Sequence, residues 1–270
     1  MNHGRWKLYT FLGLGFAFLY IPVLLLIVYS FNESRLVTVW SGFSTKWYAE
    51  LMQNQQLLDA AWLSVRIAAT NACFAVVLGT LAANALVRHG KFRGRTGFQL
   101  LLTAPLVMPE VITGLSLLLL FVTMEKTIGW PDGRGFTTIT IAHITFSMAY
   151  VAVVVRSRLS QMDRSLEEAA MDLGARPLRV YMSITLPLIA PALLSGWLLA
   201  FTLSLDDLVI STFVAGPGST TLPMVVYSSV RMGVSPQINA LASIVVLIVS
   251  VAVIVAGLSM RQRPATKSSA

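Results

Sequence analysis

The chain has 270 residues, of which 56% are hydrophobic and only 12% are charged, whereas soluble domains carry about 25% charged residues. This balance excludes a soluble globular domain, because most of the surface must face lipid. The net charge of +8 would suggest nucleic acid in a soluble protein, but here the basic residues lie between apolar stretches, so no nucleic-acid partner is expected.

Six apolar stretches are long enough to cross a bilayer, which takes about 20 residues. They predict spanning helices at approximately 8–31, 60–87, 98–124, 135–155, 188–206 and 237–260. The first stretch is longer than the apolar core of a signal peptide, which is roughly 7–15 residues, so it is expected to remain as an anchor. Together the stretches predict an all-α membrane protein with a single transmembrane domain over 1–270.

Lysine and arginine are concentrated in alternate loops. The basic segments are the amino terminus, 88–95, 156–179 and the carboxyl-terminal tail. The positive-inside rule places these segments, and therefore both termini, in the cytoplasm. Most acidic residues fall on the opposite side, where they would attract a cation; alternatively, they remain outside because they play little part in orientation.

The longest predicted cytoplasmic segment, 156–187, carries its own helix signals. Ser165 and Glu168, three residues apart, predict a capping box, and Gly174 predicts a left-handed stop. Pro177 suits the first turn of a second short helix. Such short helices are marginal in water, so the pair is expected to pack against a partner groove or against its own membrane domain.

The order of residues in this segment resembles a known motif. Glu168, Ala169 and Ala170 are followed after three residues by Gly174, and after nine more by Ile184, Leu186 and Pro187. This pattern resembles the EAA loop of permeases in binding-protein-dependent ABC importers. The resemblance implies a type I ABC importer permease fold in which Glu168 to Gly174, with Asp172, forms a helix that docks in a cleft of a cytoplasmic ATPase.

The sequence contains no G-x-x-x-x-G-K-[ST] phosphate loop. We therefore expect no enzymatic site and no cofactor in this chain, with ATP and Mg bound by the partner ATPase.

Longer stretches resemble the permeases of polyamine importers, above all those for putrescine or spermidine. These stretches are 31–51, 104–121, 165–175 and 201–234. The resemblance implies a multi-pass protein of the bacterial inner membrane. Its expected partners are an ATPase dimer, a second and different permease subunit, an extracytoplasmic polyamine-binding protein and membrane lipid.

Four residues are candidates for a cation pathway. Glu110 lies about 18 Å into the third predicted span, where a carboxylate costs on the order of 2.5 to 3.5 kcal/mol, so it should face either a wet pathway or a basic residue of the second permease. Asp206 and Asp207 end the fifth span, where the helix dipole disfavours them; a cation compensates them, or they cap the outer interface. Trp47 would flank an alkyl diamine through cation–π contact.

Two other classes of protein are alternatives to an importer permease. A stand-alone ion-coupled carrier for an organic cation would use Glu110 and His143 as proton relays, but it leaves the cytoplasmic helix pair without a role. A lone histidine inside a span is more often a packed, hydrogen-bonded residue. An intramembrane enzyme is disfavoured, because the sequence contains no H-E-x-x-H motif and no evident nucleophile–base pair.

Overall fold

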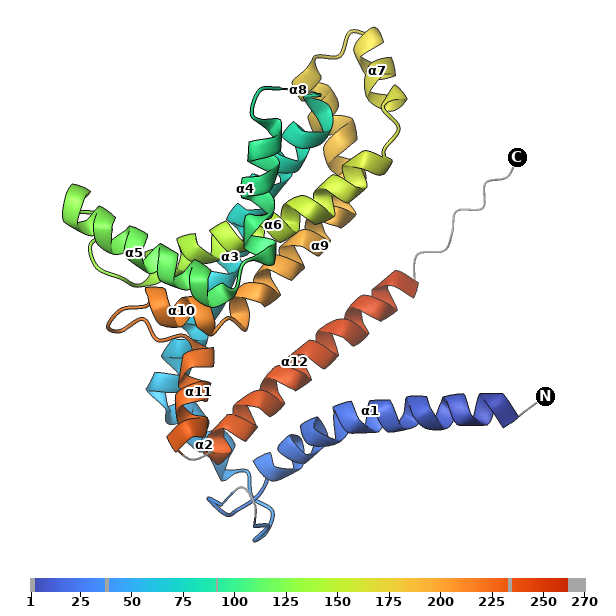
Figure 1. Ribbon diagram of the computed structural model, residues 1–270. Helices are drawn as coiled ribbons and strands as arrows, with labels where there is room; N and C mark the ends of the chain where they lie inside the picture. Colours follow the sequence, from blue (N-terminus) through green and yellow to red (C-terminus); the bar gives the residue numbers. More distant parts are fainter. Residues whose placement is uncertain (1–2, 37–38, 91, 233–234, 262–270) are drawn as a thin grey trace. The chain divides into compact units, whose positions relative to one another are not determined.

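The computed structural model describes residues 3–36, 39–90, 92–232 and 235–261, and these residues are almost entirely helical (Figure 1). The elements are α1 (His3–Ser30), α2 (Lys46–Gln53), α3 (Gln55–Arg88), α4 (Arg95–Val107), α5 (Glu110–Ile128), α6 (Phe136–Gln161), α7 (Ser165–Asp172), α8 (Pro177–Val180), the π-helix η1 (Tyr181–Thr185), α9 (Leu186–Leu205), α10 (Val209–Val214), α11 (Leu222–Met232) and α12 (Pro236–Arg261). The described ranges contain no strand, only an isolated bridge between Asn32 and Phe43. The chain ends, predicted to be cytoplasmic, lie outside these ranges.

Five helical stretches of the described chain are long and apolar enough to cross a membrane. They are Lys7–Ser30, Gln55–Arg88, Glu110–Ile128, Phe136–Gln161 and Pro177–Leu205. A shorter apolar stretch, Pro236–Val251, occupies the first part of α12. The all-α prediction is confirmed, and the count of six spans stays a prediction.

The predicted third span, 98–124, is wrong as a single helix. The chain leaves α4 at Met108, whose backbone is extended, and resumes at Glu110 as the first residue of α5. Pro109 explains the break, because a proline has no N–H to donate and disfavours helical geometry in the residue before it. Only α5, with 19 residues, is long enough to span.

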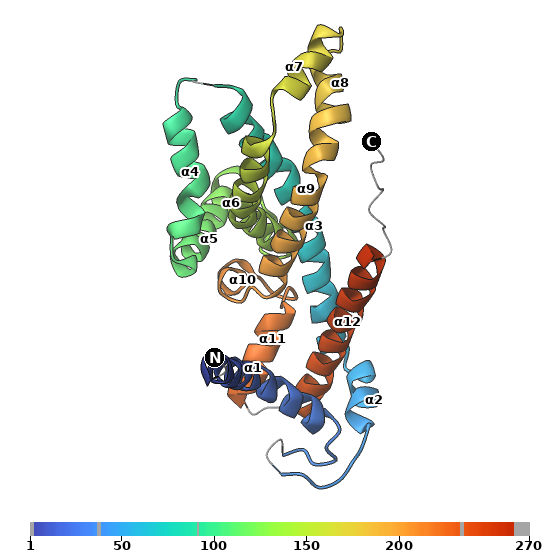
Figure 2. The ribbon, with the colours of Figure 1, turned by 90° about the vertical axis from the view of Figure 1, so that its right-hand side faces the viewer.

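The chain divides into two compact units, and residues 59–225 form the larger. In this unit α6 packs along α9, as both views show (Figures 1 and 2). Val151 of α6 fits against two glycines: a Cβ on Gly79 of α3 would come within 2.9 Å of Val151, and a Cβ on Gly196 of α9 within 3.2 Å. Small residues at such crossings let helices approach closely in a membrane, where packing rather than the hydrophobic effect holds them together.

A buried asparagine adds a polar link to the same three helices. The Asn71 side-chain amide donates to the Ser147 hydroxyl at 3.2 Å and to the Ala200 carbonyl at 2.8 Å. Because polar groups in an apolar medium need partners, Asn71 fixes the register of α3 against α6 and α9.

The smaller unit comprises residues 1–58 and 226–270, in which α12 packs against α1 and α2. Gln237 of α12 accepts a hydrogen bond from Asn54 at 2.8 Å and donates to Glu50 at 3.1 Å. Polar contacts thus join the start of α12 to the end of α2.

Candidate functional site

The first of the two short helices predicted within 156–187 is present as α7, but its start differs from the prediction. Ser165 is the first helical residue rather than the cap, and no side chain caps the helix from the Arg164 position. Instead, an Asp163 carboxylate oxygen accepts from the Ser165 N–H at 3.0 Å. This backbone hydrogen bond is the main cause that lowers the pKa of Asp163, and a hydrogen bond from the Ser165 side chain lowers it further. The predicted capping box of Ser165 and Glu168 is therefore wrong, because an aspartate two residues upstream forms a local turn.

The predicted stop at Gly174 is confirmed. Gly174 has φ +85°, its N–H donates to the Met171 carbonyl at 2.9 Å, and the Ala175 N–H donates to the Ala170 carbonyl at 3.1 Å. This pair of bonds is a Schellman motif, which satisfies the last carbonyls of a helix. A Cβ at Gly174 would meet no atom within 4 Å, so the backbone conformation alone selects glycine here.

The second short helix predicted in this segment is part of a longer helical stretch. Pro177 does occupy the first turn of a helix, but α8 continues through η1 into α9 to give one helical stretch of 29 residues. The Leu186 N–H bonds to the Tyr181 carbonyl, a widened turn directly before Pro187, which has no N–H to donate. Helices therefore extend into the predicted loop 156–187 from both sides and leave 162–176 as the elbow.

Glu167 ties the elbow to the long helices, a role that was not predicted. Its Oε1 accepts from the Arg88 guanidinium at 2.9 Å and from the Thr185 hydroxyl at 2.7 Å. The Arg88 and Glu167 side chains are only 14% and 15% exposed. A cavity of about 470 Å³ lies beside these hydrogen bonds and is lined by residues of α3, α7, α8 and η1, among them Arg88, Glu167 and Thr185. These hydrogen bonds, which we call the Glu167 anchor, therefore connect α7 to the end of α3 and to the start of the helix that leads to α9.

The motif residues lie mostly on the outside of α7. Glu168, Ala169 and Asp172 are exposed, and Ala170 is half-buried. Exposed apolar side chains surround them, namely Leu166, Met171, Leu173 and Leu178. Ile184 and Leu186 are half-buried and Pro187 is exposed on the long helix. The elbow thus presents an apolar surface with small residues at its centre, which suits a close-fitting protein partner.

At the other end of α9, Asp207 is held by hydrogen bonds. Its carboxylate accepts from the Ser211 N–H at 2.7 Å and the Ile210 N–H at 3.2 Å, in the first turn of α10. The other contact is with His143 Nε2, at 3.1 Å, while His143 Nδ1 lies 2.6 Å from the Ser204 hydroxyl. His143 is 2% exposed and Asp207 9%. His143 is therefore the packed, hydrogen-bonded residue that sequence reasoning favoured.

Asp206 differs from its neighbour. It caps α9 through its backbone N–H, which donates to the Thr202 carbonyl at 3.2 Å, and its side chain is exposed. Within the described part of the chain, its carboxylate has no ion pair and accepts no hydrogen bond from another residue. Of the two adjacent aspartates, Asp206 is the one with free acceptor oxygens.

Glu110 is exposed and begins α5. The depth predicted for it along a continuous helix does not apply, because the chain breaks at Pro109. A helix N-terminus carries partial positive charge and stabilises a carboxylate. One turn later, a Cβ at Gly114 would lie 2.7 Å from the Phe213 ring of α10. Helix α5, which begins at Glu110, therefore packs against α10, whose first turn is held by Asp207.

Trp47 lies in the smaller unit and is 2% exposed. Its indole N–H donates to the Asn32 carbonyl at 2.6 Å, and the Lys46 ammonium lies 4.7 Å from the ring centre. Trp47 thus closes the loop between α1 and α2. That it flanks a substrate stays a prediction.

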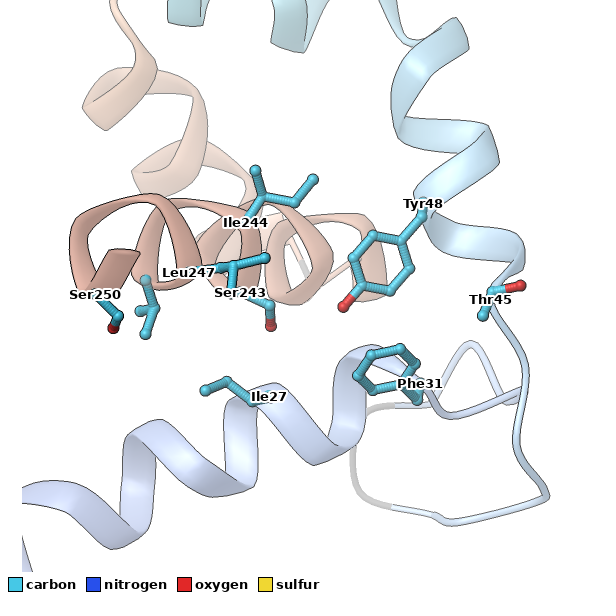
Figure 3. Close-up of a pocket in the computed structure, with 9 residues that line it drawn as sticks. Ile27, Phe31, Thr45, Tyr48, Ser243, Ile244, Leu247 and Ser250 are labelled. Carbon is cyan, nitrogen blue, oxygen red and sulfur yellow. The ribbon is translucent and has the colours of Figure 1, made fainter. Parts of the chain in front are cut away.

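The same unit contains a cavity of about 540 Å³ with a largely apolar lining. Figure 3 shows Ile27 of α1 facing Ser243 and Leu247 of α12, with the Tyr48 ring at one end. No charged residue is among the described residues that line it. An ammonium group would lose its hydration there without compensation, so this cavity does not suit a cation.

Comparison with known proteins identifies the family. Residues 75–262 match the model of the binding-protein-dependent transport system inner membrane component. The chain belongs to this family. It is therefore an inner-membrane transport protein, and the predicted relationship to ABC importer permeases is confirmed.

Two relatives are similar over most of their length. The chain is 63% identical over 240 residues to the putrescine transport system permease protein PotI of Escherichia coli K12, covering 89% of this chain and 85% of the relative. It is 44% identical over 248 residues to the spermidine/putrescine transport system permease protein PotC of the same strain, covering 92% and 91%.

The fold has a counterpart among solved structures. A crystal structure of a bacterial ABC transporter involved in the import of the acidic polysaccharide alginate has a chain that matches with a TM-score of 0.69. The match covers 94% of both chains at 16% identity. The chain thus has the fold of an ABC importer permease.

Proposed function

We propose that this chain is a permease subunit of an ATP-driven importer for polyamines, with putrescine as its main substrate. The observation that carries the proposal is the 63% identity to PotI over 89% of the chain. A stand-alone carrier is the alternative. However, the family to which this chain belongs consists of inner-membrane components of transport systems that depend on a binding protein. The proposed partners are a cytoplasmic ATPase dimer that binds ATP and Mg, a second permease subunit and an extracytoplasmic binding protein.

The elbow supports the coupling part of this proposal. The exposed face around Ala169 docks in the ATPase, and the Glu167 anchor passes its movement to α3 and to the helix Pro177–Leu205. A helical stretch of 29 residues is roughly 43 Å long at 1.5 Å per residue, enough to cross a bilayer. Motion at the elbow therefore reaches Asp206 at the other end of the same stretch.

The exposed carboxylates support a polyamine as the substrate. A polyamine carries ammonium groups, which need acceptors when they leave water. Asp206 is exposed with free oxygens, and Glu110 is exposed at a helix start. Asp207 is occupied by His143 and α10, so it holds the shape of the site rather than the substrate. Asp206 and Glu110 are the residues that we assign to the pathway.

Reconstitution tests the proposal. The chain is co-expressed with its proposed partners, purified, and placed in vesicles that contain ATP on the side of the elbow. We expect the ATPase to co-purify and labelled putrescine to accumulate only with ATP and the binding protein. Full uptake by the chain alone, without any ATPase, would establish the stand-alone carrier instead.

A further inference from the structure

A second polar site lies beside the Glu167 anchor. A cavity of about 270 Å³ forms where α3 ends, α4 begins and α6 ends. Four arginines line it, from three separate segments of the chain: Arg88, Arg95, Arg156 and Arg164. None of the described residues that line it is acidic. Since liquid water occupies about 30 Å³ per molecule, the cavity has room for a group as large as a phosphate.

Two of the arginines are fixed by backbone carbonyls at the end of α3. Arg95 donates to the Leu86 carbonyl at 2.9 Å, and Arg164 donates to the Val87 carbonyl at 2.6 Å. Carbonyls at a helix end have no partner within the helix, so this capping holds both guanidinium groups in place. Each guanidinium has five N–H donors, and one hydrogen bond leaves most of them free.

The other two arginines are less satisfied. Arg88 bonds to Glu167 through Nη2, while its Nε is buried without a hydrogen-bond partner. Arg156 is half-buried, and within the described part of the chain its guanidinium makes no ion pair or hydrogen bond; only its backbone carbonyl accepts from the Ser160 hydroxyl. Of the four guanidinium groups, only that of Arg88 pairs with a carboxylate in the described part of the chain, that of Glu167. The cavity offers the donors and the charge that an anion needs.

The surroundings distinguish a lipid from a free anion. The cavity lies next to the elbow, on the predicted cytoplasmic side, at the level where spanning helices end. Basic pockets between helices at this level bind anionic lipid headgroups. Beyond Arg95, the apolar side chains of Leu100 and Leu101 on α4 are exposed. Acyl chains can lie along this surface, which a free phosphate would leave unused.

We propose that the cavity between the ends of α3 and α6 and the start of α4 binds the phosphate of an anionic phospholipid. Arg156 and Arg88 contribute the free donors, and Arg95 and Arg164 complete the charge. The site is separate from the cation pathway at Asp206, and its occupant carries the opposite charge. A bound headgroup neutralises the arginines beside the anchor, and so stabilises the root of the elbow.

Lipid retention by the purified transporter tests this site. The transporter is reconstituted into vesicles of phosphatidylglycerol mixed with phosphatidylcholine. It is then extracted again with detergent and analysed by native mass spectrometry. The test variant is R156Q, and the matched control is R158Q, which removes the same charge from an exposed residue of α6 that does not line the cavity. We expect wild type and R158Q to retain phosphatidylglycerol, and R156Q to bind it about tenfold more weakly, because a charge-assisted hydrogen bond is lost.

Three results would overturn the proposal. The first is equal retention of the two lipids by the wild-type protein, and the second is an equal loss in R156Q and R158Q. The third is complete displacement of the lipid by millimolar inorganic phosphate, which would show a site for a free anion. If R156Q does not accumulate, R156K takes its place. The R156K variant keeps the charge but not the planar fork of donors, so it should retain an intermediate amount of phosphatidylglycerol. If R156K retains as much phosphatidylglycerol as the wild-type protein, the site is wrong.

Discussion

Removal of the Glu167 carboxylate is expected to uncouple the elbow from the membrane helices. Glu167 Oε1 accepts from Arg88 at 2.9 Å and from Thr185 at 2.7 Å. An exposed ion pair contributes about 0–1 kcal/mol, whereas a hydrogen bond to a charged group contributes about 1.5–3 kcal/mol. Because both charged side chains are about 85% buried, we expect E167A to weaken the attachment of α7 by roughly 2–3 kcal/mol, or roughly 30- to 140-fold.

The assay is the number of putrescine molecules taken up per ATP hydrolysed in reconstituted vesicles. E167A should still co-purify with the ATPase, because its docking face is intact, but its uptake per ATP should fall at least about tenfold. E168A, the exposed neighbour, should instead weaken ATPase binding. E125A, which is exposed at the end of α5, serves as the neutral control.

A double-mutant cycle with R88Q shows whether the effect belongs to the anchor. If Arg88 acts through Glu167, the two changes together should cost less than the sum of the single changes, by 0.5 kcal/mol or more. Additive effects, or normal uptake per ATP in E167A, would refute the role of the anchor.

Three further predictions concern single residues. G174A should weaken ATPase binding because a left-handed backbone costs a non-glycine residue about 1–2 kcal/mol, and G174N should be milder because asparagine adopts this conformation more readily; equal effects of the two in a pull-down would contradict this. D206N should lower putrescine uptake at unchanged membrane abundance, whereas D207N should lower the thermal unfolding temperature because both carboxylate oxygens of Asp207 accept hydrogen bonds and asparagine has only one acceptor oxygen; the reverse pattern would exchange their roles. G114L should reduce the yield of folded protein because its side chain would overlap the Phe213 ring, and a normal elution profile and melting temperature would contradict that packing.

The elbow shows what sequence reasoning can predict here. Gly174 and Pro177 act through their own backbones, so the end of α7 and the start of α8 follow from local chemistry. The capping box was wrong for an equally local reason, since Asp163 competes for the Ser165 N–H. The Glu167 anchor was out of reach, because Arg88 is 79 positions away and only the tertiary fold brings the end of α3 close to Glu167.

The membrane helices show the same difference between features that depend on local sequence and features that depend on tertiary packing. Hydropathy located the long helices, because apolar length is a property of the sequence alone. It missed the separation of α4 from α5, although Pro109 was a visible signal, because the residues on either side are equally apolar. The pairing of His143 with Asp207 depends on how α6 meets α10. Nothing in the sequence indicated which of the two aspartates would be occupied.

The contact between the elbow and an ATPase is the most direct point to measure. A photocrosslinking amino acid at position 169, on the exposed face of α7, is activated in intact membranes that import putrescine. The account predicts a crosslink to the ATPase, which a bulky residue at position 174 diminishes. Continued ATP-driven uptake with no crosslink to any ATPase would contradict it.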